Sequence, residues 1–225
     1  MCTVSFVPIE NGYCITSNRD ESIKREKAIP PKKYIINQKE IYFPKDPRAG
    51  GTWFAHDNKN CIVLLNGAEE KHILKESYRK SRGLIVLDLI SAKDSIKEWE
   101  KMDLNQIEPF TIILFYDNQL YQLQWNEFEK SSIKLDIKKS YIWSSSTLYE
   151  KKIRDERANW FVEFIESERE VTNKKLLDFH QFTQNNNKDY GLQINRNNLL
   201  KTISITQCII SKNNITFNYI DLLNQ

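Results

Sequence analysis

The chain has 225 residues, of which 40% are hydrophobic and 28% are charged, a composition typical of a globular protein with a substantial core. Its formal net charge is only +3, so the sequence has no overall electrostatic footprint for nucleic acid and we expect no nucleic-acid partner. No apolar run reaches the roughly 18 residues of a membrane span, and the first residues lack the basic region of a signal peptide, so we expect a cytoplasmic protein without stable membrane insertion.

The first predicted element is a β-hairpin. Asn11-Gly12 is the strongest short-range signal for a two-residue turn between antiparallel strands. Pairing outward from that turn places Val4 opposite Arg19 and Cys2 across from Glu21, with Arg19 one diagonal step from Cys2. The hairpin is therefore expected to return charged side chains to the start of the chain.

The middle of the chain combines strands with two helices. Residues 29–44 are rich in proline and predict an extended connector. Ala49-Gly50-Gly51 predicts a turn or a close-approach loop, and Asn66-Gly67 ends a buried strand. The expected strands here are 52–56, 61–66, 110–116 and 120–125, and the expected helices are 84–91 and 95–102.

The last third predicts strands on both sides of two helices. The expected strands are 131–136, 141–145, 202–211 and 215–221, and the expected helices are 148–168 and 172–182. Thr172 is the expected N-cap of the second helix, and the run Ser144–Thr147 is expected to cap the first. Several hairpins with grouped helices indicate an α+β fold of mainly antiparallel sheets covered by helices, and we expect residues 1–225 to form one domain.

Cys2 raises a question of chemistry because of its position. Removal of Met1 would give Cys2 a free α-amine with a reference pKa of about 7.7 to 8.0, next to a thiol of about 8.5. One residue then supplies a nucleophile and a base. The alternative is a small residue that simply permits Met1 removal. Cys14, Cys61 and Cys208 lie inside apolar runs and are expected to be buried.

The charges at the end of the hairpin favour the nucleophile. Arg19 beside the terminus would lower the thiol pKa and anchor a substrate carboxylate. Either Asp20 or Glu21 would orient the α-ammonium, although Asp20 faces the other side of the strand unless a bulge turns it. The alternative is a solvated charge cluster that closes the hairpin.

Three further residues of the middle segment are candidates for the site. Asn66, at the end of a buried strand, would donate its amide to a developing oxyanion, or it forms a turn. Thr52 and Trp53, after the double glycine, line a substrate pocket or only begin a strand.

The remaining charged motifs have a structural and a functional interpretation. Arg154 and Arg157 lie three residues apart and are expected to share a helical face. They form an exposed pair, or Arg157 supplies a second contact to a substrate anion. The basic run of residues 71–82 is a solvated helix face or loop, or else an anion site. His56, His72 and His180 show no ligand spacing, and we expect no metal.

Several of these motifs together resemble one family. MCTV, ITSNRDE, AGGTW and the buried strand that ends in Asn are similar to the NRDE family, the relatives of transport and Golgi organisation protein 2. The SRG near Ser81, WSSSTLY and ISITQ extend the likeness toward the C-terminus. The resemblance implies the N-terminal nucleophile hydrolase fold, a four-layer αββα sandwich, and a likeness to cysteine acylases that cleave linear amides.

The resemblance also implies roles for individual residues. Cys2 would be nucleophile and base, Arg19 and Asp20 its supporting pair, and Asn66 an oxyanion donor. The acylases separate the arginine from the aspartate, whereas Arg19 and Asp20 are adjacent here, so Glu21 is the alternative acid.

Three functions follow from these observations. The first is hydrolysis of a non-peptide C–N amide through a Cys2 thioester, which needs no cofactor. The second, in line with family links to secretory-pathway organisation, lipid metabolism and haem handling, is a carrier of a hydrophobic anionic ligand such as haem or an acyl-lipid. The third is a scaffold that retains the fold without catalysis.

Overall fold

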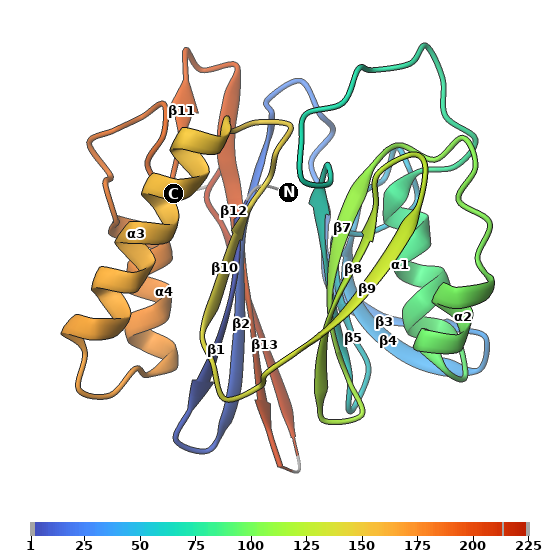
Figure 1. Cartoon of the computed structure of the whole chain (residues 1–225), viewed down its shortest axis with the longest axis horizontal. Coiled ribbons are helices and arrows are strands. Elements are labelled where there is room, and N and C mark those ends of the chain that lie inside the picture. Colours follow the sequence, from blue (N-terminus) through green and yellow to red (C-terminus); the bar gives the residue numbers. More distant parts are fainter. Residues whose placement is uncertain (1–2, 213, 224–225) are drawn as a thin grey trace. The chain divides into compact units, whose positions relative to one another are not determined.

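The computed structural model describes residues 3–212 and 214–223, and it divides into two compact units (Figure 1). Unit 1 comprises residues 1–25 and 137–225, and unit 2 comprises residues 26–136. Unit 2 is therefore one continuous segment inserted between the two parts of unit 1. Each unit has its own antiparallel sheet and its own pair of helices.

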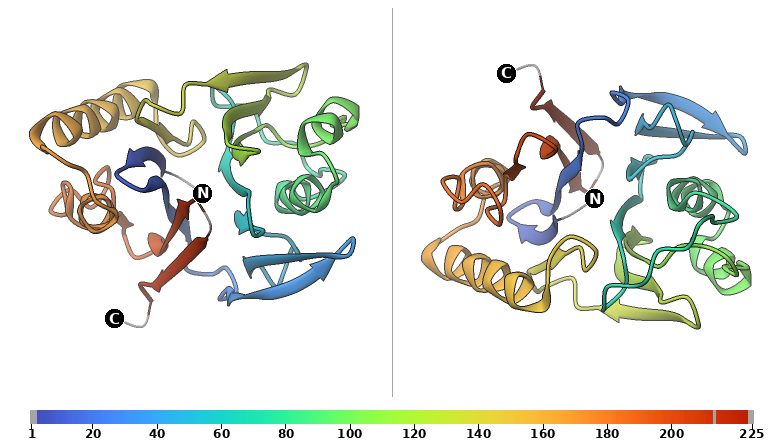
Figure 2. Two further views of the ribbon diagram at one scale, coloured as in Figure 1. Left: turned by 90° about the horizontal axis from the view of Figure 1, so that it is seen from below. Right: turned by 90° about the horizontal axis from the view of Figure 1, so that it is seen from above.

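The sheet of unit 1 has the strand order β10-β1-β2-β12-β11, and β13 also pairs with β12. Its strands are β1 (Thr3–Ile9), β2 (Gly12–Ser22), β10 (Tyr141–Ser144), β11 (Asn195–Arg196), β12 (Leu200–Ser211) and β13 (Ile215–Asp221). Helices α3 (Lys151–Ser167) and α4 (Asn173–Phe182) lie along one face of this sheet (Figures 1 and 2). Val7 and Cys14 of the sheet pack against Phe161, Leu176 and Phe179 of these helices, which forms the core of the unit.

The sheet of unit 2 keeps its strands in sequence order from β3 to β9. Its strands are β3 (Ile29–Ile36), β4 (Lys39–Lys45), β5 (Phe54–His56), β6 (Cys61–Asn66), β7 (Phe110–Tyr116), β8 (Gln119–Trp125) and β9 (Lys130–Leu135). Helices α1 (Arg82–Ser91) and α2 (Ser95–Lys101) pack together, and α1 contacts β4, β5 and β6. The central strands β6 and β7 are buried along nearly their whole length, in keeping with their predominantly apolar sequences.

The expected α+β class is confirmed. Both sheets are antiparallel throughout their described pairings, and each unit supplies one sheet and one pair of helices, the parts of the expected αββα sandwich. All four expected helices are present, and Thr172 caps α4 by accepting a hydrogen bond from the Lys175 amide. The expected cap of α3 is wrong: its N-cap is Glu150, while the hydroxyls of Ser145 and Thr147 bond each other at 2.8 Å.

The register of the first hairpin differs from the prediction by two residues. Ile9 pairs with Gly12, so the turn lies at Glu10-Asn11, and Val4 lies opposite Ser17 instead of Arg19. The reason is that Gly12 is needed where β2 passes close to β12, and not in the turn. A Cβ at Gly12 would lie 1.9 Å from the Ile210 carbonyl oxygen of β12, so this glycine permits close approach of two strands rather than a turn.

The expected connector at residues 29–44 is instead the hairpin of β3 and β4. Asn37 and Gln38 form its turn, with φ angles of 49° and 65°. The prolines at positions 30 and 31 are tolerated because β3 is an edge strand and its register is irregular between Ile29 and Lys32. Proline content alone therefore misidentified this segment.

Candidate functional site

The sequence-predicted site residues divide between the two units. Cys2 lies outside the described residues. The structure places Arg19, Asp20 and Glu21 on β2 and Arg157 on α3, all in unit 1. Thr52, Trp53 and Asn66 belong to unit 2. The site is therefore described one unit at a time.

Arg19 and Asp20 are consecutive residues of β2, so their side chains point to opposite faces of the sheet. Asn18 and Asp20 share the face that carries the helices, since Asn18 bonds His180 of α4. Arg19 lies on the other face and is 3% exposed. Its Nη2 lies 3.7 Å from Oε2 of Glu21, whose side chain is 29% exposed. Glu21, rather than Asp20, is thus the carboxylate on the Arg19 face.

Asp20 is held by hydroxyl groups on the helix side of the sheet. The Tyr149 hydroxyl donates to Oδ2 at 2.6 Å, and the Thr202 hydroxyl donates to Oδ1 at 2.5 Å. Thr202 also accepts a hydrogen bond from the Ile194 amide at 2.8 Å, which fixes its hydroxyl. A buried carboxylate needs such donors because burial without them costs several kcal/mol.

A bulge in β12 lies beside this pair. Thr202 pairs with Asp20 and Ser204 pairs with Arg19, so Ile203 is the extra residue. Bulges commonly re-aim side chains next to functional sites. Here the irregularity lies on the partner strand of β2, and it brings the Thr202 hydroxyl to the Asp20 carboxylate.

Arg157 is fully buried, so its interpretation as half of an exposed pair is wrong. Its Nη1 donates to the Thr3 hydroxyl at 2.7 Å, and its Nε and Nη2 donate to the carbonyls of Tyr190 and Gly191. The guanidinium also stacks 3.6 Å from the centre of the Tyr149 ring. Arg157 therefore ties the first described residue of β1 to the helical layer.

A buried network that the sequence analysis missed joins Ser5, Asn18 and His180. Asn18 Nδ2 donates to two carbonyls, so its Oδ1 accepts from His180 Nδ1 at 2.6 Å. The neutral ring then accepts from the Ser5 hydroxyl at Nε2, at 2.7 Å. Burial, with a smaller contribution from the charge of Arg157, lowers the pKa of His180 to about 3.

The order Ser–His–Asn matches that of a catalytic triad, but all three side chains are fully buried. Within unit 1 the network joins α4 to β1 and β2. The sequence signal for it is partial: Ser5 is a polar residue in the apolar run of β1, whereas Asn18 lies in the continuous polar run of residues 16–22.

The double glycine before Thr52 meets the start of α1. A Cβ at Gly51 would lie 2.3 Å from the carbonyl carbon of Gly83, and the Thr52 amide donates to the Gly83 carbonyl. The motifs AGGTW and SRG are thus joined at one junction, which requires glycine on both sides. The Thr52 hydroxyl donates to the Pro44 carbonyl at 2.6 Å and accepts from the Phe54 amide at 3.3 Å, and Trp53 is buried.

Asn66 is the last residue of β6, pairs with Phe110 of β7, and is half-buried. Gly67 follows it with a φ of +84°, and the Gly67 amide donates to the Pro109 carbonyl. The Asn-Gly pair therefore ends the strand in a fixed backbone turn. Its role as an oxyanion donor stays a prediction.

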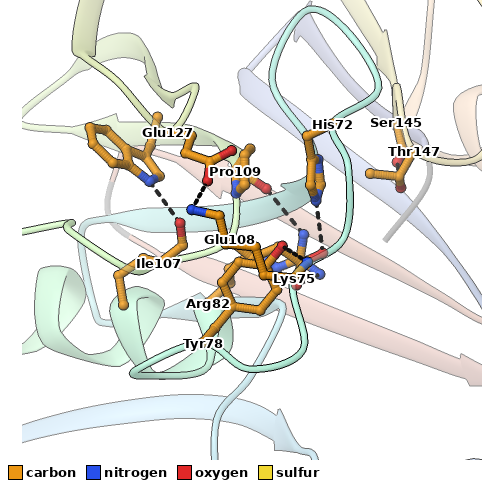
Figure 3. Close-up of polar contacts among 11 residues, drawn as sticks. His72, Lys75, Tyr78, Arg82, Ile107, Glu108, Pro109, Glu127, Ser145 and Thr147 are labelled. Carbon is orange, nitrogen blue, oxygen red and sulfur yellow. Dashed lines mark hydrogen bonds and ion pairs between the residues drawn. The ribbon is translucent and has the colours of Figure 1, made fainter.

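The basic run of residues 71–82 lies in the loop between β6 and α1, up to the first residue of α1, and is largely exposed, as the solvated interpretation expected, and most of its charges are paired. Lys75 pairs with Glu127 and Lys80 pairs with Asp88. Arg79 pairs with Asp103 at 3.2 Å. Arg82 and His72 share the carboxylate of Glu108, at 2.9 and 3.2 Å (Figure 3). These ion pairs attach the long loop between β6 and α1 to the rest of unit 2.

The described cysteines and histidines do not form a further catalytic group. Cys14, Cys61 and Cys208 are buried as expected, and burial raises the pKa of the Cys14 thiol to about 12. Among residues 3–212 and 214–223 no group of three His, Cys, Asp or Glu side chains is arranged to hold a metal ion. In the same residues no helix has the length and apolarity needed to cross a membrane.

Comparison with known proteins identifies a family and distantly similar solved structures. The family described as Transport and Golgi organisation 2 matches residues 1–214. No curated protein matches the chain. The solved structure of Anbu from Hyphomicrobium sp. strain MC1 is 9% identical and aligns over 98% of this chain and 88% of that chain, with a TM-score of 0.39. That score is too low to transfer a property of Anbu to this chain.

Proposed function

We propose that this chain, which belongs to the Transport and Golgi organisation 2 family, is a cytoplasmic hydrolase of linear C–N amides whose nucleophile is Cys2. The proposal rests on buried charged side chains near Thr3, where β1 begins and the second half of β2 lies beside it. Arg19, Asp20 and Arg157 are at most 3% exposed there, and Arg157 holds the Thr3 side chain. Clusters of buried charge are costly, and they concentrate where a reaction needs tuned groups.

The first half of the proposed reaction acylates the thiol. After removal of Met1, the α-amine of Cys2 takes the thiol proton, and the thiolate attacks the amide carbonyl to form a C–S bond. Arg19 favours the thiolate by its positive charge, with Glu21 as the acid on the same face. Asn66 would donate to the oxyanion. Collapse of the intermediate breaks the C–N bond, and the α-ammonium gives its proton to the leaving amine.

The second half regenerates the enzyme. Water attacks the thioester carbonyl while the α-amine accepts a proton from it. The C–S bond then breaks, the product leaves as a carboxylic acid, and the thiol recovers its proton. Arg157 and Asp20 are positioning residues in this scheme, since their hydrogen bonds fix β1 and β2 rather than reach a substrate.

Intact mass spectrometry with a thiol alkylator tests the proposal before a substrate is known. We expect the native protein to lack Met1 and to gain one adduct rapidly, which a peptide map places on Cys2. Cys14, Cys61 and Cys208 are fully buried, so they serve as internal controls that react only after unfolding.

A panel of fluorogenic acyl amides then measures the reaction. Cys2→Ala should abolish hydrolysis, whereas Cys208→Ala, which changes a buried thiol, should retain it. Retention of Met1 in active protein, or hydrolysis by Cys2→Ala at the wild-type rate, would refute the role of Cys2.

A further inference from the structure

A cavity in unit 2 is lined by none of the residues assigned above to the reaction. It has a volume of about 610 Å³, and its walls come from the loop after β6 and from the β8–β9 hairpin. All of its lining residues lie between positions 68 and 133, so the cavity belongs to unit 2 alone. This volume is in the range of cavities that hold small organic ligands.

The loop that forms one wall is fixed rather than loose. It has no regular secondary structure between β6 and α1, yet Lys75 is paired with Glu127 of the opposite wall (Figure 3). Arg79 and Lys80 pair with Asp103 and Asp88 at its far end. Long irregular loops that are held in place are usually functional, and a preformed cavity avoids the cost of ordering a wall on binding.

The rim of the cavity presents apolar side chains to solvent. Ile73 is 89% exposed and Phe128 is 87% exposed, and both line the cavity from opposite walls. Ile133 of β9 is half-exposed beside them. Large apolar side chains gathered around a cavity are typical of a binding surface, because their burial by a ligand is favourable.

The charges of the lining favour a cation. Four glutamates line the cavity against one lysine, and the carboxylate of Glu127 is paired with Lys75, which is not part of the lining. Within the described part of the chain, the carboxylates of Glu69 and Glu129 have no partner. Lys71 is also unpaired there, but it faces an excess of negative charge. A positively charged ligand is therefore complementary to this lining.

His72 adds a hydrogen-bond acceptor. A carboxylate can only accept, so Nε2 donates its proton to Glu108, and when the ring carries that proton alone Nδ1 has a lone pair. The His72 side chain is 8% exposed and lines the cavity, and its Nδ1 is buried without a partner among the described residues. A buried acceptor of this kind is completed by a ligand that donates an N–H.

We propose that this cavity binds an amphipathic amine, with its apolar chain against Ile73, Phe128 and Ile133 and its ammonium group among Glu69, Glu129 and His72. None of the residues that line this cavity takes part in the proposed Cys2 reaction. Cys2→Ala is therefore expected to bind the amine with the affinity of the wild type. Loss of hydrolysis in this variant then tests the proposed reaction, and its amine binding tests the proposed cavity ligand independently.

Calorimetric titration of the full chain with three matched probes, below their micelle-forming concentrations, tests the charge preference. We expect octylammonium to bind with one-to-one stoichiometry, and octanoate to bind at least about tenfold more weakly. Octyltrimethylammonium has the positive charge but no N–H, so its affinity should lie between those of the other two probes. In His72→Phe, octylammonium and octyltrimethylammonium should bind with equal affinity. Equal or tighter binding of octanoate would overturn the proposal, as would the absence of saturable octylammonium binding.

Two variants with matched controls locate the site. Phe128→Ala should weaken octylammonium binding roughly fivefold to tenfold, whereas Phe182→Ala, which truncates a 58% exposed phenylalanine of unit 1, should leave it unchanged. Glu69→Gln combined with Glu129→Gln should also weaken binding, unlike Glu10→Gln combined with Glu166→Gln on other exposed glutamates. Unchanged affinity in Phe128→Ala would place the amine elsewhere and refute the assignment.

Discussion

Arg19 and Asp20 show how strand geometry assigns different tasks to adjacent charges. Asp20 receives hydrogen bonds from Tyr149 and Thr202 on the helix side of the sheet, while Arg19 lies near Glu21 on the other face. Because successive side chains of a strand alternate, Asp20 is fixed on the helix side of the sheet while Arg19 lies on the opposite face. The adjacency of the two residues, which departs from the acylase pattern, is explained if Glu21 is the acid beside Arg19.

His180 gives a prediction about the pH dependence of stability. Its folded pKa of about 3 lies below the ordinary value of 6.5, so below pH 6.5 the unfolded chain binds more protons than the folded one. Its contribution is therefore constant above pH 6.5, and stability falls by about 1.4 kcal/mol per pH unit as the pH drops toward 3. Urea unfolding of the wild type and of His180→Gln between pH 4 and 8 measures this contribution.

The comparison of the two proteins isolates His180 from the carboxylates, which titrate in both. His180→Gln should be less stable than the wild type at pH 7.5, because Ser5 and Asn18 lose the well-aligned hydrogen bonds that they form with the His180 ring. The difference between the two proteins should shrink as the pH falls below 6.5. A difference that stays constant down to pH 4 would show that His180 is not held neutral.

At the scale of elements, sequence patterns predicted the strands and helices better than their pairing. Apolar periodicity located all four helices and the central strands of unit 2, because burial on one face or on both imposes a direct pattern. The first hairpin was wrong in register since Gly12 is required by β12, a strand almost two hundred residues away. The β3–β4 hairpin was missed because its turn residues, Asn37 and Gln38, include no glycine.

The surroundings of the predicted site residues were predictable only in part. Arg19, Asp20 and Glu21 were predicted as site residues from their place at the end of the first hairpin, and the structure places them on β2 with Arg19 and Asp20 buried. The partners Tyr149 and Thr202 were not predictable, because they reach Asp20 only through long-range pairing. Periodicity reports which face is buried and not which side chain meets which.

The junction between Gly51 and Gly83 gives a prediction at this scale. An alanine at Gly51 would place its Cβ 2.3 Å from a backbone atom of α1, so either the loop or the helix start must move. We expect Gly51→Ala to destabilise unit 2 by about 2 to 3 kcal/mol. Gly50→Ala is the control, because a Cβ at Gly50 would meet open space. Its only penalty is that alanine would adopt a φ of +72°, which costs about 1 kcal/mol. Equal melting temperatures of the two variants would contradict the close approach.

At the scale of the whole molecule, the two units differ in how far apart their paired strands lie in the sequence. Neighbouring strands of unit 2 follow one another along the chain, as in β7 and β8, where Tyr116 pairs with Gln119. In unit 1, β10 pairs with β1, so Ser144 meets Thr3 only after all of unit 2 has been bridged. Closing so long a loop costs conformational entropy before any contact compensates for it.

This difference predicts an order of folding. During refolding from urea, amides of the β7–β8 hairpin should become protected from hydrogen exchange before amides of β10. The β1–β2 hairpin is the internal control, because it lies in unit 1 but its strands are close in sequence. If sequence separation sets the order, its amides should be protected at the same time as those of β7–β8. If membership of a unit sets the order, they should be protected together with β10. Pulse-labelling exchange read by mass spectrometry resolves the three segments. Protection of β10 in the same phase as β7–β8 would show that the chain orders both sheets in one cooperative step, and that the insertion of unit 2 imposes no delay on the strand that pairs with the start of β1.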